Sequence, residues 1–205
     1  INAVPDFETK SSYNFNVKAS DPSGAFSTQA VTLNINDVAP VITSATSTTV
    51  AEGTSTATVV YTAIANDIAG GTVTYALTGT DAAAFTINST TGAVTFNAIP
   101  DFDTKTSYSF NVKASDPSGA FTTQAVTISI SNVAPVITSA TSVNVPEGVT
   151  AGSTVYSSIA ADLGGGTVTY AISGTDAAAF TLNTTTGVVT INATPDFETK
   201  TSYSF

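Results

Sequence analysis

The chain repeats itself every 95 residues without insertion or deletion, and this register constrains its fold more than any other feature. The hexapeptide at Pro5–Lys10 returns at Pro100–Lys105 and again at Pro195–Lys200. The segment Val38–Ile42 returns unchanged at Val133–Ile137. A fixed period of this size indicates an array of similar modules, and 95 residues are enough for each module to bury its own core.

The charge of the chain excludes several classes of partner. The net charge is −10, and five lysines without an arginine are the only basic side chains. Nucleic acids and anionic membrane surfaces need a basic face, so neither is expected to bind. No apolar run reaches the roughly 18 residues of a membrane span, so we expect no membrane insertion. An acidic surface is compatible with divalent cations such as Ca²⁺.

The residue types that are missing limit the chemistry. Without His or Cys, the chain has no Ser–His or Cys–His nucleophile pair and no such ligands for zinc or haem. A carboxylate pair alone could hydrolyse glycosides, but a β-rich module with small polar loops offers no obvious cleft. We therefore predict that the protein is not an enzyme. Since secreted eukaryotic modules of this size commonly carry disulfides, the absence of Cys favours a bacterial exported protein.

Apolar and polar residues alternate with period two along most of the middle repeat, which is typical of strands with one buried face. Val, Ile, Thr, Tyr and Phe dominate these runs, and turn residues separate them. The one candidate for helical structure is a single turn at 82–84. The pattern predicts an all-β, seven-stranded Greek-key β-sandwich, with strands at about 41–49, 56–65, 71–79, 84–88, 93–98, 106–115 and 120–131.

Two short Pro-bearing junctions, at Asn36–Pro40 and Ser131–Pro135, divide the chain. They predict the back part of one module at 1–39, a complete module at 40–134 and the front part of a third at 135–205. Junctions this short limit bending, so the modules are expected to join end to end. We expect the chain to be a window on a longer array. The alternative is a fibre subunit whose third module is completed by residues 1–39 of the next subunit, through strand addition.

Several motifs of the middle repeat occur in a familiar order. Ala51-Glu52-Gly53 is followed by Asn66-Asp67, then by Pro100-Asp101-Phe102-Asp103, then by Ala114-Ser115-Asp116, and the repeat closes at Asn132–Pro135. This order resembles the cadherin repeat, in the form found in bacterial giant adhesins and repeat-rich surface proteins. The resemblance extends over the whole chain and implies calcium bound where successive modules join.

The resemblance also implies which residues hold calcium. At the first junction these are Asp6, Glu8, Asn36, Asp37, Asp67 and Asp116. At the second junction they are Glu52, Asp101, Asp103, Asn132 and Asp162. Asp21, Glu147, Asp196 and Glu198 belong to outer junctions. Each carboxylate also has a purely structural explanation, because Asp before Pro-Ser-Gly commonly forms a turn.

The junctions depart from the family pattern. The family has an Asp-x-Asp pair in the module that follows each junction. In this chain the second Asp of that pair is replaced by Ala69 and by Gly164. Asn132 also stands where the first junction has Asp37. We therefore expect fewer ions than the family holds, and weaker binding at the second junction.

These observations predict an extender segment of an extracellular, surface-anchored fibre or adhesin stalk, stiffened by Ca²⁺. Its partners would be neighbouring repeats, with a cell-surface or matrix glycan or protein at a distal end. The alternative is an adhesive module that binds a glycan or a like partner, although no aromatic cluster marks a sugar platform.

Overall fold

The computed structural model describes residues 3–68 and 70–205. The described chain consists of short strands and two single turns of 3₁₀ helix. It forms two compact units. One holds the residues up to Val50 with Thr54–Pro100 and Lys105–Ile130, and the other holds Ala51–Gly53, Asp101–Thr104 and Ser131–Phe205. The module boundaries at 39/40 and 134/135 stay predictions.

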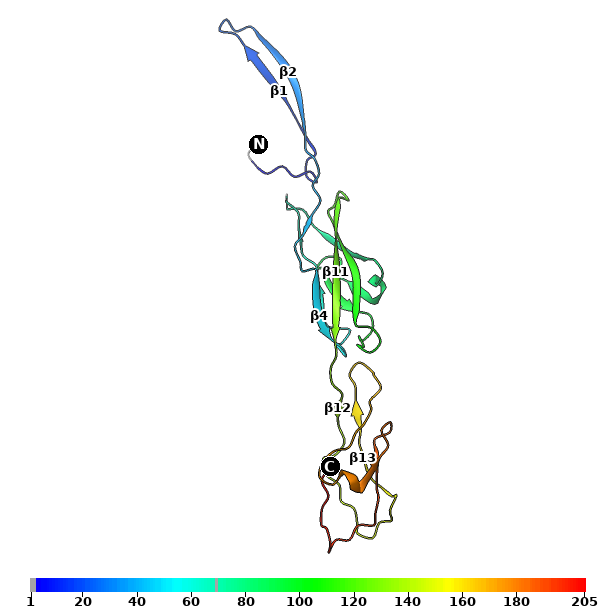
Figure 1. The fold of residues 1–205 in the computed structure, drawn as a ribbon. Helices are drawn as coiled ribbons and strands as arrows, with labels where there is room; N and C mark the ends of the chain where they lie inside the picture. The colour runs from blue at the N-terminus through cyan, green and yellow to red at the C-terminus, as the bar shows by residue number, and fades with distance from the viewer. Residues whose placement is uncertain (1–2, 69) are drawn as a thin grey trace. The chain divides into compact units, whose positions relative to one another are not determined.

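A two-stranded antiparallel hairpin begins the first unit (Figure 1). Strands β1 (Ser12–Ser20) and β2 (Phe26–Asn34) pair in continuous register, with Phe15 opposite Val31. Gly24 closes the tight turn between them with a φ of +91°, a conformation that glycine adopts without steric cost.

The complete β-sandwich lies between residues 40 and 131, and its larger sheet has four strands. Their order is β4 (Ser47–Ala51), β11 (Phe121–Ser131), β10 (Ser107–Ser115) and β7 (Thr74–Thr78). β10 and β11 form the long central hairpin, whose register matches that of β1 and β2 moved by 95 positions.

The second layer of the sandwich is built of shorter strands. β5 (Tyr61–Thr62), β9 (Ala93–Phe96) and β8 (Phe85–Ile87) form one sheet. β3 (Val41–Ile42) pairs with β6 (Ala65–Asn66). The 3₁₀ turn η1 (Ala82–Ala84) leads directly into β8, as the sequence predicted.

The core lies between the two layers, and aromatic rings fill its centre. Phe110 of β10 is 2% exposed and packs against Phe85 and Tyr61 of the opposite layer, with ring centroids 4.9 Å and 6.2 Å away. Val112 and Ala114 alternate with half-buried residues of the same strand and are themselves fully buried. The predicted β-sandwich is confirmed, and period-two alternation is its cause.

The predicted number of strands is wrong in two places. The predicted strand 41–49 appears as β3 and β4, and the predicted strand 56–65 appears as β5 and β6, so the described residues of 40–134 hold nine strands instead of seven. In both places the chain changes its pairing partner: β3 pairs with β6 while β4 joins the other sheet, and β5 pairs with β9. Period-two alternation cannot show such a change, because both halves keep an apolar face.

The unit at the end of the chain has a smaller core. β13 (Thr154–Ser157), β16 (Val188–Ile191) and β15 (Phe180–Leu182) form a sheet, β12 (Val136–Ile137) pairs with β14 (Ala160–Ala161), and η2 (Ala177–Ala179) precedes β15. Phe180, Val189 and Ile191 form its buried centre. Within residues 3–68 and 70–205, no helix has the length and apolar character needed to cross a bilayer.

Candidate metal centre

Three carboxylates predicted for the first junction lie together. Ligand oxygens of Glu8, Asp37 and Asp116 are all within 4.8 Å of one another. Asp116 is 5% exposed, and Glu8 and Asp37 are half-buried. Glu8 and Asp37 lie on one side of the junction at Pro40 and Asp116 lies on the other, so the cluster joins segments far apart in sequence.

Local turns position two of these side chains. Asp116 Oδ1 accepts hydrogen bonds from the backbone N–H groups of Gly119 (2.8 Å) and Ala120 (2.9 Å), which fixes the turn between β10 and β11. Glu8 follows the turn that Asp6 forms by accepting the Glu8 N–H (3.0 Å) and the Thr9 hydroxyl (2.6 Å). Asp and Asn favour such turns because their short side chains reach the backbone two or three residues on.

One oxygen of each clustered carboxylate lacks a donor. Glu8 Oε1, Asp37 Oδ1 and Asp116 Oδ2 are buried and have no hydrogen-bond partner. The Ser118 hydroxyl lies between Asp37 Oδ2 and Asp116 Oδ1 and carries only one proton for the two. A buried acceptor without a donor costs about 1–3 kcal/mol, and more when it is charged. The cluster therefore needs positive charge.

The electrostatics of Glu8 agree with this conclusion. The largest influence on the pKa of the Glu8 carboxyl is a hydrogen bond with its own backbone N–H, which lowers it. Three other influences raise the pKa: the hydrogen bond with Asp6, desolvation, and repulsion by the charges of Asp37 and Asp67. Together they outweigh the backbone hydrogen bond, so the pKa of Glu8 is raised. The two lysine ion pairs within the described residues use Asp81 and Asp176 instead of this cluster.

The donor set fits a hard cation. Calcium binds about six to eight oxygens at about 2.3–2.6 Å, so two oxygens on one ion lie within roughly 5.2 Å of each other. The clustered oxygens all lie within 4.8 Å of one another and so satisfy that limit. Asp67 is half-buried and is close enough for its charge to act on Glu8. Asp6 instead faces its own turn, and Asn36 is exposed.

The carboxylates predicted for the second junction are arranged differently from those of the first. Glu52 is 3% exposed, and each of its oxygens accepts a backbone N–H, Oε1 from Val133 at 2.6 Å and Oε2 from Phe102 at 3.0 Å. Asp101 repeats the turn of Asp6 by accepting the Asp103 N–H (2.9 Å) and the Thr104 hydroxyl (2.6 Å). Backbone donors therefore satisfy both oxygens of Glu52, whereas Glu8, Asp37 and Asp116 of the first cluster each keep one oxygen without a donor.

Two glycines, Gly164 and Gly166, lie against the carboxylates predicted for the second junction. A Cβ at Gly166 would lie 2.3 Å from Asp103 Oδ2 and 2.8 Å from Asp162 Oδ2, so these carboxylates converge there. A Cβ at Gly164 would lie 2.3 Å from Glu52 Oε2. A side chain at Gly164, where the family pattern has an Asp, would therefore require the Glu52 carboxylate to move. The corresponding Ala69 lies outside the described residues.

The remaining predicted residues are exposed. Asp21 closes the hairpin turn by accepting the Ser23 hydroxyl (2.6 Å) and the Ala25 N–H (3.0 Å), and Asn132 has no carboxylate to offer. Glu147, Asp196 and Glu198 have ligand oxygens within 4.8 Å of one another but are exposed. Exposed acidic groups of this kind are common without a metal.

The sequence did not predict the roles of two side chains, Ser118 and Asp81. Ser118 enters the first cluster through its hydroxyl, and its place in Asp-Pro-Ser-Gly gave only a turn signal. Asp81 pairs with Lys105, at 2.5 Å, and accepts the Ser109 N–H at 2.8 Å. The alanine run after Asp81 concealed this role, although the same pairing returns between Asp176 and Lys200.

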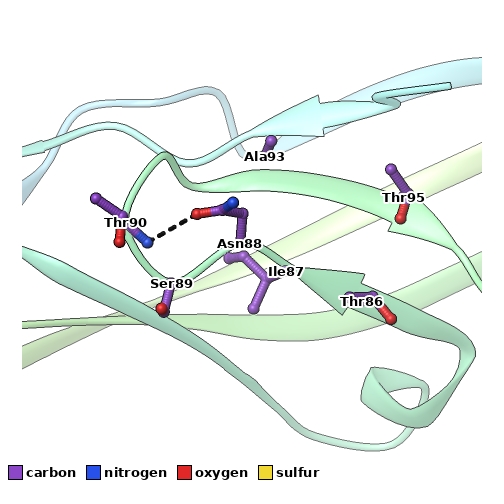
Figure 2. A pocket seen from close by; sticks show the side chains of 7 residues that line it. All are labelled: Thr86, Ile87, Asn88, Ser89, Thr90, Ala93 and Thr95. Atoms are coloured by element: carbon purple, nitrogen blue, oxygen red, sulfur yellow. Dashed lines mark hydrogen bonds between the residues drawn. The ribbon is translucent and has the colours of Figure 1, made fainter. Parts of the chain in front are cut away.

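A separate depression lies on the β8–β9 hairpin and has a volume of about 540 Å³ (Figure 2). Asn88 shapes the loop, because its Oδ1 accepts the N–H groups of Thr90 and Thr91 at 3.0 Å. The lining consists of small polar and aliphatic side chains: Thr86, Ile87, Asn88, Ser89, Thr90, Ala93 and Thr95. Such a lining supplies no ring for stacking on a sugar.

A comparison of protein families agrees with the β-sandwich fold of the middle repeat. Residues 46–131 match the family model of the cadherin domain. This part of the chain is therefore a cadherin-like β-sandwich. No curated protein matches the chain.

The chain is also similar in structure to solved cadherin fragments. Human protocadherin-24 EC1-2 (form II) is 23% identical with a TM-score of 0.48, and the match covers 78% of this chain and 80% of that one. Mouse cadherin-23 EC22-24 is 24% identical with a TM-score of 0.48, over 95% of this chain and 68% of that one. For the protocadherin gammaB4 extracellular domain the values are 22% and 0.47, over 95% of this chain and 36% of that one.

Proposed function

We propose that this chain is an extender segment of a longer extracellular repeat protein, in which calcium at the first junction restricts bending between successive modules. One observation carries the proposal: the carboxylates of Glu8, Asp37 and Asp116 come together from both sides of Pro40, and each has a buried oxygen without a donor. An ion bound there would tie the two sides of the junction together.

The junction itself supports the same role. Pro40 is fully buried, and its carbonyl accepts the Thr122 hydroxyl at 2.7 Å. The peptide that leaves Asp37 is therefore anchored within three residues. With its backbone anchored and its carboxylates linked by a cation, the junction has few ways to bend.

We propose weaker binding at the second junction. Glu52 already accepts two backbone N–H groups, and Asn132 replaces the bridging carboxylate. An ion there would compete with existing hydrogen bonds, whereas at the first junction it meets unsatisfied oxygens. The residues left for an ion are Asp103 and Asp162, whose oxygens converge at Gly166.

Calorimetric titration of the whole chain with CaCl₂, combined with hydrogen exchange at residues 34–40, tests the proposal. We expect a stronger class of sites that Asp37→Asn abolishes, with slower exchange of the junction amides when calcium is bound. Extracellular calcium modules bind with dissociation constants of about 10⁻⁴–10⁻³ M. The absence of heat at millimolar calcium, or unchanged exchange at the junction, would refute it.

A further inference from the structure

An asparagine begins the loop of the β8–β9 hairpin, and another begins the loop of the β15–β16 hairpin 95 residues later. Asn88-Ser89-Thr90 and Asn183-Thr184-Thr185 both fit the sequence Asn-X-Ser/Thr, in which X is not proline. A third match is Asn192-Ala193-Thr194. Sugars are attached to asparagine within this sequence. The sequence does not separate the three matches, but their hydrogen bonds do.

The two loop asparagines are held in the same way. Asn88 Oδ1 accepts the backbone N–H groups of Thr90 and Thr91 at 3.0 Å, and Figure 2 shows the first of these bonds. Asn183 makes the same two bonds in its own loop, also at 3.0 Å. Because the amide oxygen accepts and the amide nitrogen only donates, these bonds determine which amide atom faces the loop backbone.

The amide nitrogens of the two loop asparagines are left free. Since Oδ1 is held against the loop backbone, Nδ2 points away from it. Among the described residues, neither nitrogen has a hydrogen-bond partner. Asn88 and Asn183 are both exposed. An exposed amide nitrogen without a partner is the group to which a sugar can be attached.

Asn192 is held differently, although it is also exposed. Its Nδ2 donates to the Ala178 carbonyl at 3.1 Å, and its Oδ1 accepts the Thr181 hydroxyl at 2.7 Å. Asn97 of the complete sandwich makes the corresponding two bonds, at 3.0 Å and 2.6 Å. The amide of Asn192 therefore has to leave both partners before it can react.

The depression beside Asn88 offers space for the first sugar. It has a volume of about 540 Å³, and Ser89, Thr90 and Thr95 supply hydroxyls to its lining. A sugar attached covalently needs no aromatic ring for stacking, because the covalent bond keeps it in place. Its hydroxyls can exchange hydrogen bonds with those of the lining.

We propose that Asn88 and Asn183 are acceptor sites for N-linked sugar, one in each of two successive repeats. The donor is a sugar joined through its anomeric carbon to a diphosphate, which a nucleotide or a lipid carries. Asparagine Nδ2 forms a bond to the anomeric carbon while the bond between that carbon and the diphosphate oxygen breaks. The diphosphate leaves with the bonding electrons, and a base of the transferase takes one proton from the nitrogen. No residue of the calcium cluster takes part, so failure of either proposal leaves the other intact.

Two reactions on the whole 205-residue chain test the two kinds of donor. A purified asparagine glucosyltransferase with UDP-glucose tests the nucleotide-linked donor, and secretion from a eukaryotic cell line tests the lipid-linked donor. Peptide mass spectrometry locates the sugars. We expect sugar on Asn88 and Asn183 in at least one reaction, which identifies the donor. Absence of sugar from both residues in both reactions overturns the assignment.

Thr90→Ala removes the hydroxyl of the acceptor sequence but keeps the backbone N–H that Asn88 Oδ1 accepts. This variant should lose attachment at Asn88 and keep it at Asn183, which serves as the internal control. Thr90→Ser returns a hydroxyl and should restore attachment. Sugar on Asn88 of Thr90→Ala would mean that any exposed amide reacts, and it would contradict the proposal.

A comparison of the folded chain with its proteolytic digest tests the role of the free amide. With UDP-glucose, Asn88 and Asn183 should react about as fast in the folded chain as in the digest. Asn192 should react at least about tenfold more slowly than Asn88 in the folded chain, because two hydrogen bonds hold its amide. Loop asparagines that react only after digestion, or a folded chain in which Asn192 reacts as fast as Asn88, would overturn the assignment.

Discussion

Asp37 and Asp116 share the single hydroxyl proton of Ser118, although 79 residues separate them in sequence. The hydroxyl can donate to only one carboxylate at a time, and the second oxygen of each is buried without a partner. Two negative groups held in this way repel each other unless a cation lies between them. This relationship is the basis of the calcium predictions.

Asp116→Asn should weaken calcium binding at the first junction at least about tenfold, which corresponds to about 1.4 kcal/mol. The amide keeps an acceptor oxygen for the turn but removes one negative charge from the cluster. Calorimetry on the whole chain measures the change. Asp21→Asn is the matched control, because Asp21 forms the same Asp-Pro-Ser-Gly turn in the exposed β1–β2 hairpin. Equal losses in both variants would show that the net charge of the chain, and not the cluster, determines the affinity.

Asn132→Asp should strengthen the second junction. It restores, at the second junction, the carboxylate that Asp37 supplies at the first. The oxygens of Asp103 and Asp162 already converge at Gly166 of that junction. We expect the affinity of the weaker sites to rise toward that of the first junction, by roughly tenfold for each added 1.4 kcal/mol. Titration of the variant beside the wild type measures it, with Asn34→Asp as a control for added charge in an exposed strand residue. Equal gains in the two variants would mean that net charge alone is responsible.

Acid should remove the stabilisation that Asp81 provides. Its hydrogen bond with Lys105, followed by that with the Ser109 N–H, lowers the pKa of Asp81 below its ordinary value of 3.8. Because the folded state has the lower pKa, the contribution is complete above 3.8 and is lost as the pH falls through the folded value. Urea midpoints of the wild type and Asp81→Asn should differ at neutral pH and converge below pH 3.8. A difference that is independent of pH would contradict this assignment.

The alternation of apolar residues was sufficient to predict the sandwich but not its exact strands. Phe110, Val112 and Ala114 follow period two, and all three are buried. The chain around Ala63 and Ile64 keeps its β-like composition while it passes from β9 to β3 as pairing partner. Pairing partners are a tertiary property that local periodicity does not contain.

The candidate site was predicted as a set of residue types, and the structure separates them by their hydrogen bonds. Asp6 and Glu8 are two residues apart in one motif, yet Asp6 satisfies its own turn while Glu8 reaches the cluster. Glu52, predicted as a ligand, accepts backbone N–H groups from Phe102 and Val133 at its two oxygens. The spacing of motifs in the sequence predicts which carboxylates lie near a junction. Which of them accept hydrogen bonds from backbone N–H groups depends on the three-dimensional structure.

Gly92→Ala should destabilise the sandwich by more than about 2 kcal/mol. Gly92 has a φ of +70°, and an added Cβ would lie 2.2 Å from the Ala63 carbonyl oxygen, so β5 would have to move away from β9. Gly119→Ala is the control, because its φ is +99° but nothing lies within 4 Å of an added Cβ. This control should cost only about 1 kcal/mol. Equal urea midpoints for the two variants would show that backbone conformation, and not the close approach, requires glycine at position 92.

Phe110→Ala should destabilise the complete sandwich by about 3–5 kcal/mol, because it removes the ring that packs against Tyr61 and Phe85 and leaves a cavity. Phe15→Ala makes the same change one repeat earlier, where the ring is 51% exposed, and should alter the unfolding free energy by less than about 0.5 kcal/mol. Urea denaturation at a concentration where the chain is monomeric measures both. A large effect of Phe15→Ala under those conditions would mean that the ring packs within its own molecule.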